Sequence, residues 1–142
     1  MKFKNIEDIW IWQESVNLCE DIFRFTAKSS PSLIQDHELS SHLRKTAISI
    51  PSNISEGFGR ESLSEFRRFL VIARGSCAEL RTQILIANKV DKLPLEIWQD
   101  LDAETSQISR KIFKLISYLK KEIMKKKVER VEGGREAGRN SS

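Results

Sequence analysis

Residues 48–60 read ISIPSNISEGFGR, and this stretch decides the fold because it differs from the sequence on both sides of it. Apolar residues recur at helical spacing before and after it, yet it contains a proline, three serines and two glycines one residue apart. Four interpretations are open: a β-strand, a phosphate-binding loop, a catalytic serine site, or a helix close to its end. The choice among them separates a catalytic site from a structural segment.

Three of these interpretations lack the partners that they need. A strand is disfavoured because Pro51 directly follows Ile50, and proline is confined to the edges of sheets. A phosphate-binding loop requires a preceding strand and either a third glycine or a Gly-Lys-Ser/Thr sequence, and Gly57-Phe58-Gly59 has none of these. The serines have no histidine nearby and no GxSxG elbow, which argues against a catalytic serine.

The remaining interpretation is a helix that carries Pro51 near its C-terminal end. Proline removes one N–H and crowds the carbonyl of Ala47, four residues earlier, at a cost of about 3 kcal/mol. We expect tertiary packing to offset this cost, and the hydroxyl groups of Thr46 and Ser49 are candidate partners for the freed backbone groups. Gly57 or Gly59 is predicted to close the helix in the left-handed conformation.

Apolar residues at steps of three and four predict four helical segments. The first is expected to have its N-cap at Asn5, and the second to begin within residues 32–36. The third is predicted at Ser62, whose spacing to Glu65 is that of a capping box, and the fourth at Pro94. The predicted apolar stripes are Ile9, Trp12, Val16, Cys19 and Phe23; Leu39, Leu43, Ala47, Ile50 and Ile54; Phe66, Phe69, Leu70, Ala73, Cys77, Leu80, Ile84 and Ala87; and Trp98, Leu101, Thr105, Ile108, Ile112, Leu115, Leu119 and Ile123.

Short connections between long helices favour antiparallel neighbours. We therefore predict an all-α fold, an antiparallel up-down-up-down four-helix bundle, over residues 1–127. Residues 128–142 are predicted to be a polar, disordered tail, with the last helix ending by Gly133-Gly134. The first segment is apolar nearly all round at its start, so either the bundle wraps this end or another chain covers it. The third also has more apolar surface than one core contact needs, because Val71, Ile72, Leu85 and Ile86 lie off its stripe.

The distribution of charge is uneven along the chain. Residues 1–109 contain 13 Lys/Arg and 16 Asp/Glu, a net charge of −3, whereas residues 110–142 contain 11 Lys/Arg and 4 Asp/Glu, a net charge of +7. A basic segment of this kind can bind phosphates, or it can simply suit the negative end of a helix dipole. The candidate nucleic-acid-binding residues are Lys120, Lys121, Lys125, Lys126, Lys127 and Arg130. Aromatic residues are not interleaved with these lysines, which argues against sequence-specific reading of single strands.

Composition restricts the remaining classes of function. No apolar run approaches the roughly 20 residues of a membrane span, and the first ten residues lack the apolar region of a secretory signal. Cys19 and Cys77 lie within apolar stripes and are expected to be buried, reduced thiols of a cytoplasmic protein. No metal-ligand set, nucleophile–base pair or cofactor loop is visible, so we expect no enzymatic activity and no cofactor.

A polar stripe accompanies the apolar face of residues 39–54. Its members Ser49, Asn53, Glu56 and Arg60 are separated by steps of four, three and four. One interpretation is a solvated face. The other is a hydrogen-bonded structural network with Glu79, Arg74 or Arg67 of the third helix.

Two stretches resemble a known family. Residues 39–60, LSSHLRKTAISIPSNISEGFGR, resemble the signature of the four-helix bundle proteins encoded by intervening sequences in bacterial 23S rRNA genes. Residues 66–80, FRRFLVIARGSCAEL, are similar to that family's third helix. The resemblance covers about residues 5–122 and departs from the usual signature at His42, where glutamine is usual, and at Ser55, where alanine is usual.

The resemblance implies a bundle that assembles into a ring, a homopentamer. The family is also similar to the accessory variability determinant of diversity-generating retroelements, a pentameric barrel that binds nucleic acid and a reverse transcriptase. Two alternative functions are therefore expected. One is a non-enzymatic oligomer that binds RNA or DNA, and the other is a scaffold or accessory subunit for a protein partner such as a reverse transcriptase.

Overall fold

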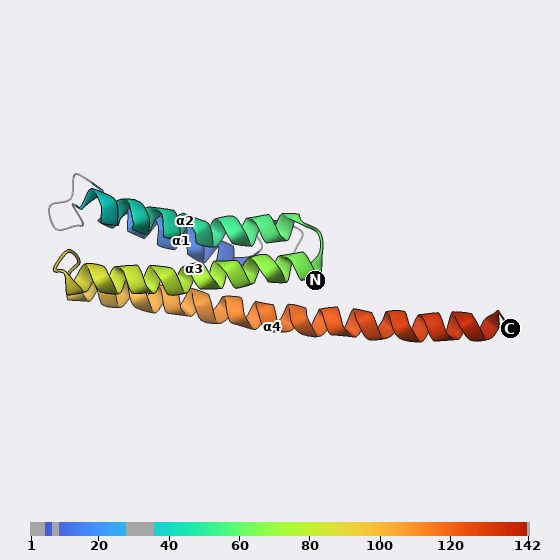
Figure 1. The fold of residues 1–142 in the computed structure, drawn as a ribbon. Coiled ribbons are helices and arrows are strands. Elements are labelled where there is room, and N and C mark those ends of the chain that lie inside the picture. The colour runs from blue at the N-terminus through green and yellow to red at the C-terminus, as the bar shows by residue number, and fades with distance from the viewer. Residues whose placement is uncertain (1–4, 7–8, 28–35, 142) are drawn as a thin grey trace.

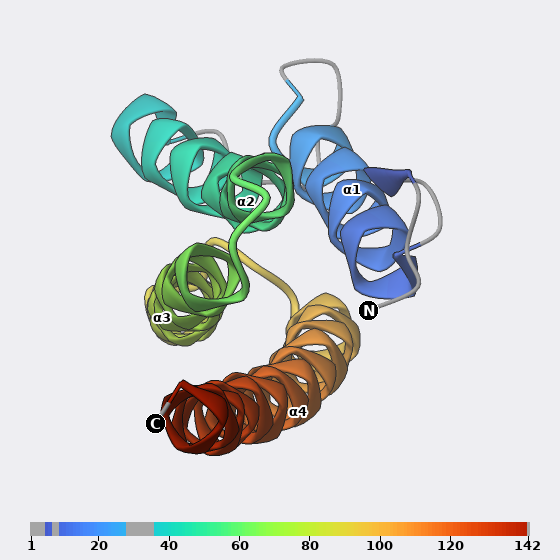
Figure 2. The same ribbon diagram turned by 90° about the vertical axis from the view of Figure 1, so that its right-hand side faces the viewer.

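The chain forms an all-α fold in a computed structural model that describes residues 5–6, 9–27 and 36–141. Its helices are α1 (Trp10–Phe25), α2 (His37–Gly59), α3 (Leu63–Lys89) and α4 (Leu95–Asn140). The described residues contain no strand. In the end-on view the helices occupy four corners, with α1 packed against α2 and α4, and α3 packed against the same two helices (Figure 2). The α2–α3 connection lies at one end of the bundle and the α3–α4 connection at the other (Figure 1).

The buried faces of α2 and α3 are those that the sequence predicts. Leu43, Ala47, Ile50 and Ile54 of α2 are fully buried, and the whole predicted stripe of α3 from Phe66 to Ala87 is buried. Leu39 is half-buried against this core. Both helices begin at a side-chain cap, because Asp36 accepts a hydrogen bond from the Leu39 N–H and Ser62 accepts one from the Glu65 N–H. Residues 32–35, where α2 was also predicted to begin, lie outside the described residues.

The prediction for α1 is wrong in its cap and in its face. The helix begins at Trp10 after Ile9, so Asn5 does not cap it. Its buried residues are Ile11, Ser15, Leu18 and Ile22. Of the predicted stripe, Ile9 is buried in the core, Trp12, Val16 and Cys19 are half-buried, and Phe23 is exposed. Because apolar residues surround the first turns of this helix, spacing alone selects the wrong one of two adjacent faces.

Pro51 lies inside α2, as predicted, and it is buried. The end of the helix differs from the prediction. No described glycine has a positive φ, and Glu61 takes the left-handed conformation with φ of 60°. Gly57 has a different role. A Cβ built on it would lie 2.6 Å from the Cβ of Phe69, so the absence of a side chain lets α2 approach α3 closely.

The last helix is longer than predicted. Its core face ends with buried Leu119, and from Met124 onward every described residue is exposed. Figure 1 shows this part of α4 projecting past the end of the bundle. The sequence predicts a stop by Gly133-Gly134 and a disordered tail, but α4 continues to Asn140. A packed helix has already met the cost of nucleation, so each further residue adds one backbone hydrogen bond, which favours extension through the glycines.

Candidate nucleic-acid interface

The candidate interface begins where α4 leaves the bundle. The core-facing positions of α4 follow steps of three and four through Ile116, Leu119 and Ile123. The next positions at the same spacing are Lys126 or Lys127 and then Arg130. One continuous face of α4 thus changes from apolar to basic at the point where no other helix covers it.

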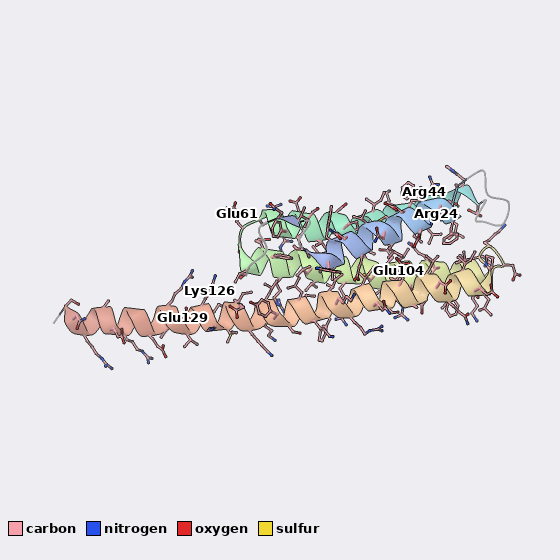
Figure 3. The ribbon with its side chains drawn as sticks, turned by 180° about the vertical axis from the view of Figure 1, so that it is seen from behind. Arg24, Arg44, Glu61, Glu104, Lys126 and Glu129 are labelled. Carbon is pink, nitrogen blue, oxygen red and sulfur yellow. The ribbon has the colours of Figure 1, made fainter. Side chains whose placement is uncertain are left out.

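The basic positions line an open cavity of about 810 Å³. The cavity lies beside the connection between α2 and α3, residues 58–66, which we call the α2–α3 corner. Figure 3 shows Glu61 at this corner and Lys126 on the projecting part of α4 just beyond it. The cavity is lined from the corner by Phe58, Gly59, Glu61, Ser62, Leu63, Ser64 and Phe66, and from α4 by Ile123, Lys126, Lys127 and Arg130. Two segments about 60 residues apart in the sequence therefore form one surface.

Packing between two aromatic rings positions the apolar wall of the cavity, which includes Phe58 and Leu63. The ring of Phe58 lies edge-to-face against Phe66, with ring centroids 6.0 Å apart and planes at 87°. Phe66 is buried in the core, whereas Phe58 is half-buried and lines the cavity. Since a T-shaped pair is a favoured aromatic arrangement, Phe66 gives Phe58 a defined position.

The basic wall of the cavity consists of Lys126, Lys127 and Arg130. Within the described part of the chain, no ion pair with Asp or Glu neutralises these residues. The ion pairs there are Arg24–Asp21, Arg60–Glu56, Arg68–Glu65, Arg81–Asp102 and Lys111–Glu14. None of them includes Lys126, Lys127 or Arg130. These three cations are exposed and remain available to an anionic partner.

The structure brings only some of the predicted basic residues to the cavity. Lys126, Lys127 and Arg130 line it, whereas Lys120, Lys121 and Lys125 are exposed on α4 without lining it. Phe58 is not among the residues that the sequence predicts to bind nucleic acid, because it lies about 60 residues before the lysines. Its place beside a basic segment depends on the α2–α3 corner, and the sequence contains no local signal for that placement.

The predicted polar network between α2 and α3 is not formed by hydrogen bonds among the described residues. Within α2, Ser49 Oγ donates to the carbonyl of Thr46 at 2.6 Å, Asn53 Nδ2 donates to the carbonyl of Ser49 at 2.7 Å, and Arg60 pairs with Glu56 at 2.8 Å. Glu79 accepts from Gln83 within α3 at 3.4 Å. The short side chains of Ser49 and Asn53 reach backbone carbonyls one turn earlier, and the exposed side chains of Glu56 and Arg60 pair with each other.

Arg60 of the stripe contacts α3. Its guanidinium carbon lies 5.3 Å from the centroid of the Phe69 ring. The contact is a cation–π interaction at an exposed site, where such contacts contribute roughly 0.5–1 kcal/mol.

The other titratable groups of the described residues form no cluster that could bind a metal ion. No group of three or more His, Cys, Asp or Glu side chains is placed there to bind a metal ion. Burial raises the pKa of Cys19 to about 11 and that of Cys77 to about 12, so both free thiols stay protonated and unreactive near neutral pH. No described helix combines the length and the hydropathy that crossing a bilayer requires.

The fold and this surface define a four-helix bundle protein with a basic helical extension. The chain belongs to the family of 23S rRNA-intervening sequence proteins, whose model matches residues 7–114. The projecting part of α4, with all the basic residues of the cavity, lies beyond the matched range. No curated protein matches the chain.

A solved structure supports the fold. The chain is similar to the crystal structure of a protein of unknown function from the S23 ribosomal protein family of Bacteroides thetaiotaomicron, with a TM-score of 0.66 and 16% sequence identity. The similarity covers 75% of this chain and 97% of the other. At this identity the likeness concerns the fold alone.

Proposed function

We propose that the chain is a non-enzymatic, oligomeric bundle protein that binds RNA or other nucleic acid through the basic residues of α4. The observation that carries this proposal is the set of three unpaired cations, Lys126, Lys127 and Arg130, beside an open cavity. Phosphates neutralised by such cations release counterions, which favours binding at low salt. Lys120, Lys121 and Lys125 add positive charge along the same helix.

Assembly into a ring, with a homopentamer as the expected form, is part of the same proposal. Val71, Ile72, Leu85 and Ile86 lie on the side of α3 away from the core and are 39–49% exposed. A face of this kind favours contact with another copy of the chain. Connections at opposite ends of the bundle support the antiparallel up-down-up-down arrangement that a ring of this family would contain. The proposed location is the cytoplasm.

The test is binding of the purified protein to structured RNA at about 50 and 200 mM salt. We expect binding at the lower salt and a loss at the higher salt. Replacing Lys125, Lys126 and Lys127 with Ala should weaken binding and reduce its salt dependence, because each lost phosphate contact lowers the slope by about 0.7–0.9. Replacing Lys45, Lys89 and Lys92 of the bundle removes the same charge and should weaken binding less. No binding at about 50 mM salt would remove the proposal.

A second candidate function is a scaffold or accessory subunit for a protein partner such as a reverse transcriptase. The exposed apolar face of α3 favours it as well, and so does the proposed relation to the accessory variability determinant of diversity-generating retroelements. Native mass spectrometry of the protein with and without cellular RNA separates the two candidates. A homo-oligomer that gains RNA mass supports the first, and a chain that stays free of RNA favours the second.

A further inference from the structure

We propose that the cavity between the α2–α3 corner and α4 holds an unstacked base of a single-stranded nucleic acid. In this arrangement Phe58 stacks on the base, and Lys126, Lys127 and Arg130 bind the neighbouring phosphates. This inference rests on the proposed function and deepens it, because it states which form of nucleic acid the site takes.

The cavity has the size and the two kinds of wall that a nucleotide requires. Its volume of about 810 Å³ falls within the range of small-molecule sites. Phe58 and Leu63 supply apolar surface on one side, where Glu61 is the one acidic residue of the lining, and the three cations lie on α4. Proteins that bind single strands combine these same elements, a basic surface along the backbone and aromatic rings on which bases stack.

The aromatic wall discriminates between single strands and duplexes. In a duplex the bases are stacked and paired, so only the phosphates can reach a surface of this kind. A single strand can turn a base out toward Phe58 while its phosphates stay beside α4. An acidic peptide would use the cations as well, but it would gain nothing from an aromatic ring.

The position of Phe58 is set before any ligand binds. Its edge-to-face contact with Phe66 anchors it to the core, with ring centroids 6.0 Å apart. A ring that is already ordered loses little side-chain entropy on binding, which increases affinity. Both rings come from the α2–α3 corner, so the corner and α4 together determine the spacing of base and phosphate.

The experiment measures the affinities of the full chain for a labelled oligo(U) strand of about 12 nucleotides and for an RNA duplex of equal length. Phe58→Leu should lower the affinity for the single strand by at least about fivefold and leave the affinity for the duplex within about twofold. Phe58→Tyr keeps the stacking ring and should retain single-strand binding. Circular dichroism melting of each variant shows whether the bundle remains folded.

Two charge variants complete the test. The triple variant K126A/K127A/R130A removes the basic wall, and K121A/K125A/R135A removes equal charge from positions of α4 that do not line the cavity. We expect the first to lower the preference for single strand over duplex, and the second to weaken binding to both without changing their ratio.

The outcomes distinguish the two proposals. If the wild-type chain binds neither nucleic acid at low salt, the proposed function fails and this inference fails with it. If the chain binds both and Phe58→Leu affects them equally or not at all, the proposed function stands and the base site is wrong. Competition by poly-glutamate as strong as competition by oligo(U) would also overturn the base site, in favour of an acidic peptide.

Discussion

The thiol of Cys19 in α1 donates a hydrogen bond of 3.0 Å to the backbone carbonyl of Ala47 in α2. This carbonyl is the one that loses its helical partner, because residue 51 is proline and has no N–H. The pKa of Cys19, raised to about 11 by burial, keeps the thiol protonated and able to donate. Ser49, the expected partner of a freed group, donates to Thr46 instead. A side chain of the neighbouring helix therefore compensates for the proline.

This relationship predicts an energetic coupling between Cys19 and Pro51. Cys19→Ala should destabilise the protein by about 1–3 kcal/mol, because it leaves the Ala47 carbonyl unsatisfied. In a Pro51→Ala background the new N–H bonds that carbonyl, so the same replacement should cost about 1 kcal/mol less. Urea unfolding of the wild type, the two single variants and the double variant measures this coupling as a double-mutant cycle. Equal costs in both backgrounds would show that the thiol does not replace the missing helical bond.

Gly57 should tolerate no side chain. Gly57→Ala places a Cβ 2.6 Å from that of Phe69, and the two helices must separate, at a cost of about 1–3 kcal/mol. Gly59→Ala is the matched control, since its Cβ would meet nothing within 4 Å. Thermal melting should therefore show a clear loss of stability for Gly57→Ala and no loss for Gly59→Ala. Similar melting temperatures for the two variants would contradict the close approach of α2 and α3.

Glu104 of α4 should make stability depend on pH. Burial raises its pKa from 4.5 to about 7, with further contributions from Asp21 and Glu14 of α1. The folded state thus holds a proton that the unfolded state releases, so this contribution to stability is present below about pH 4.5 and is lost as the pH rises through about 7. Glu104→Gln should be more stable than the wild type at pH 8. The difference between the two proteins should be smaller at pH 5, as denaturant unfolding at both values would show.

Asp21→Asn is the companion variant for this prediction. It removes the largest charged contribution to the raised pKa of Glu104 but leaves the burial of Glu104 unchanged. The pH dependence should therefore shrink without disappearing. A stability difference between wild type and Glu104→Gln that stays constant from pH 5 to pH 8 would exclude the raised pKa.

Arg44 of α2 should stabilise the end of α1. Its Nε donates to Thr26 Oγ1 at 2.7 Å, its Nη2 donates to the Thr26 carbonyl at 3.1 Å, and its guanidinium carbon lies 4.6 Å from the centroid of the Phe23 ring. Lysine cannot reproduce this fork, so Arg44→Lys should cost about 1–2 kcal/mol in chemical unfolding. Replacement of the exposed neighbour Lys45 by Ala should change stability by less than about 0.5 kcal/mol. If Arg44→Lys destabilises the protein no more than the replacement of Lys45, the contacts of the Arg44 guanidinium with Thr26 and Phe23 do not stabilise α1.

The sequence by itself determined the helical class, the buried faces of α2 and α3, and the family. The apolar stripe of residues 39–54 and the stripe of residues 66–87 repeat every three or four residues, and this period is a property of the local backbone. The proline inside α2 was also predicted, because the stripe keeps its phase through residue 51. Where apolar residues surround the helix, as at the start of α1, the period is ambiguous and the predicted face is wrong.

Only the tertiary structure decided the contacts that join distant segments. The bond from Cys19 to Ala47, the approach of Gly57 to Phe69, and the placement of Phe58 beside Lys126 each depend on how far one helix lies along another. Such offsets come from the packing of whole helices, and no periodicity within one segment contains them. The continuation of α4 past Gly133-Gly134 has a similar origin, because a helix that is nucleated by packing in the bundle can extend through residues that would not start one.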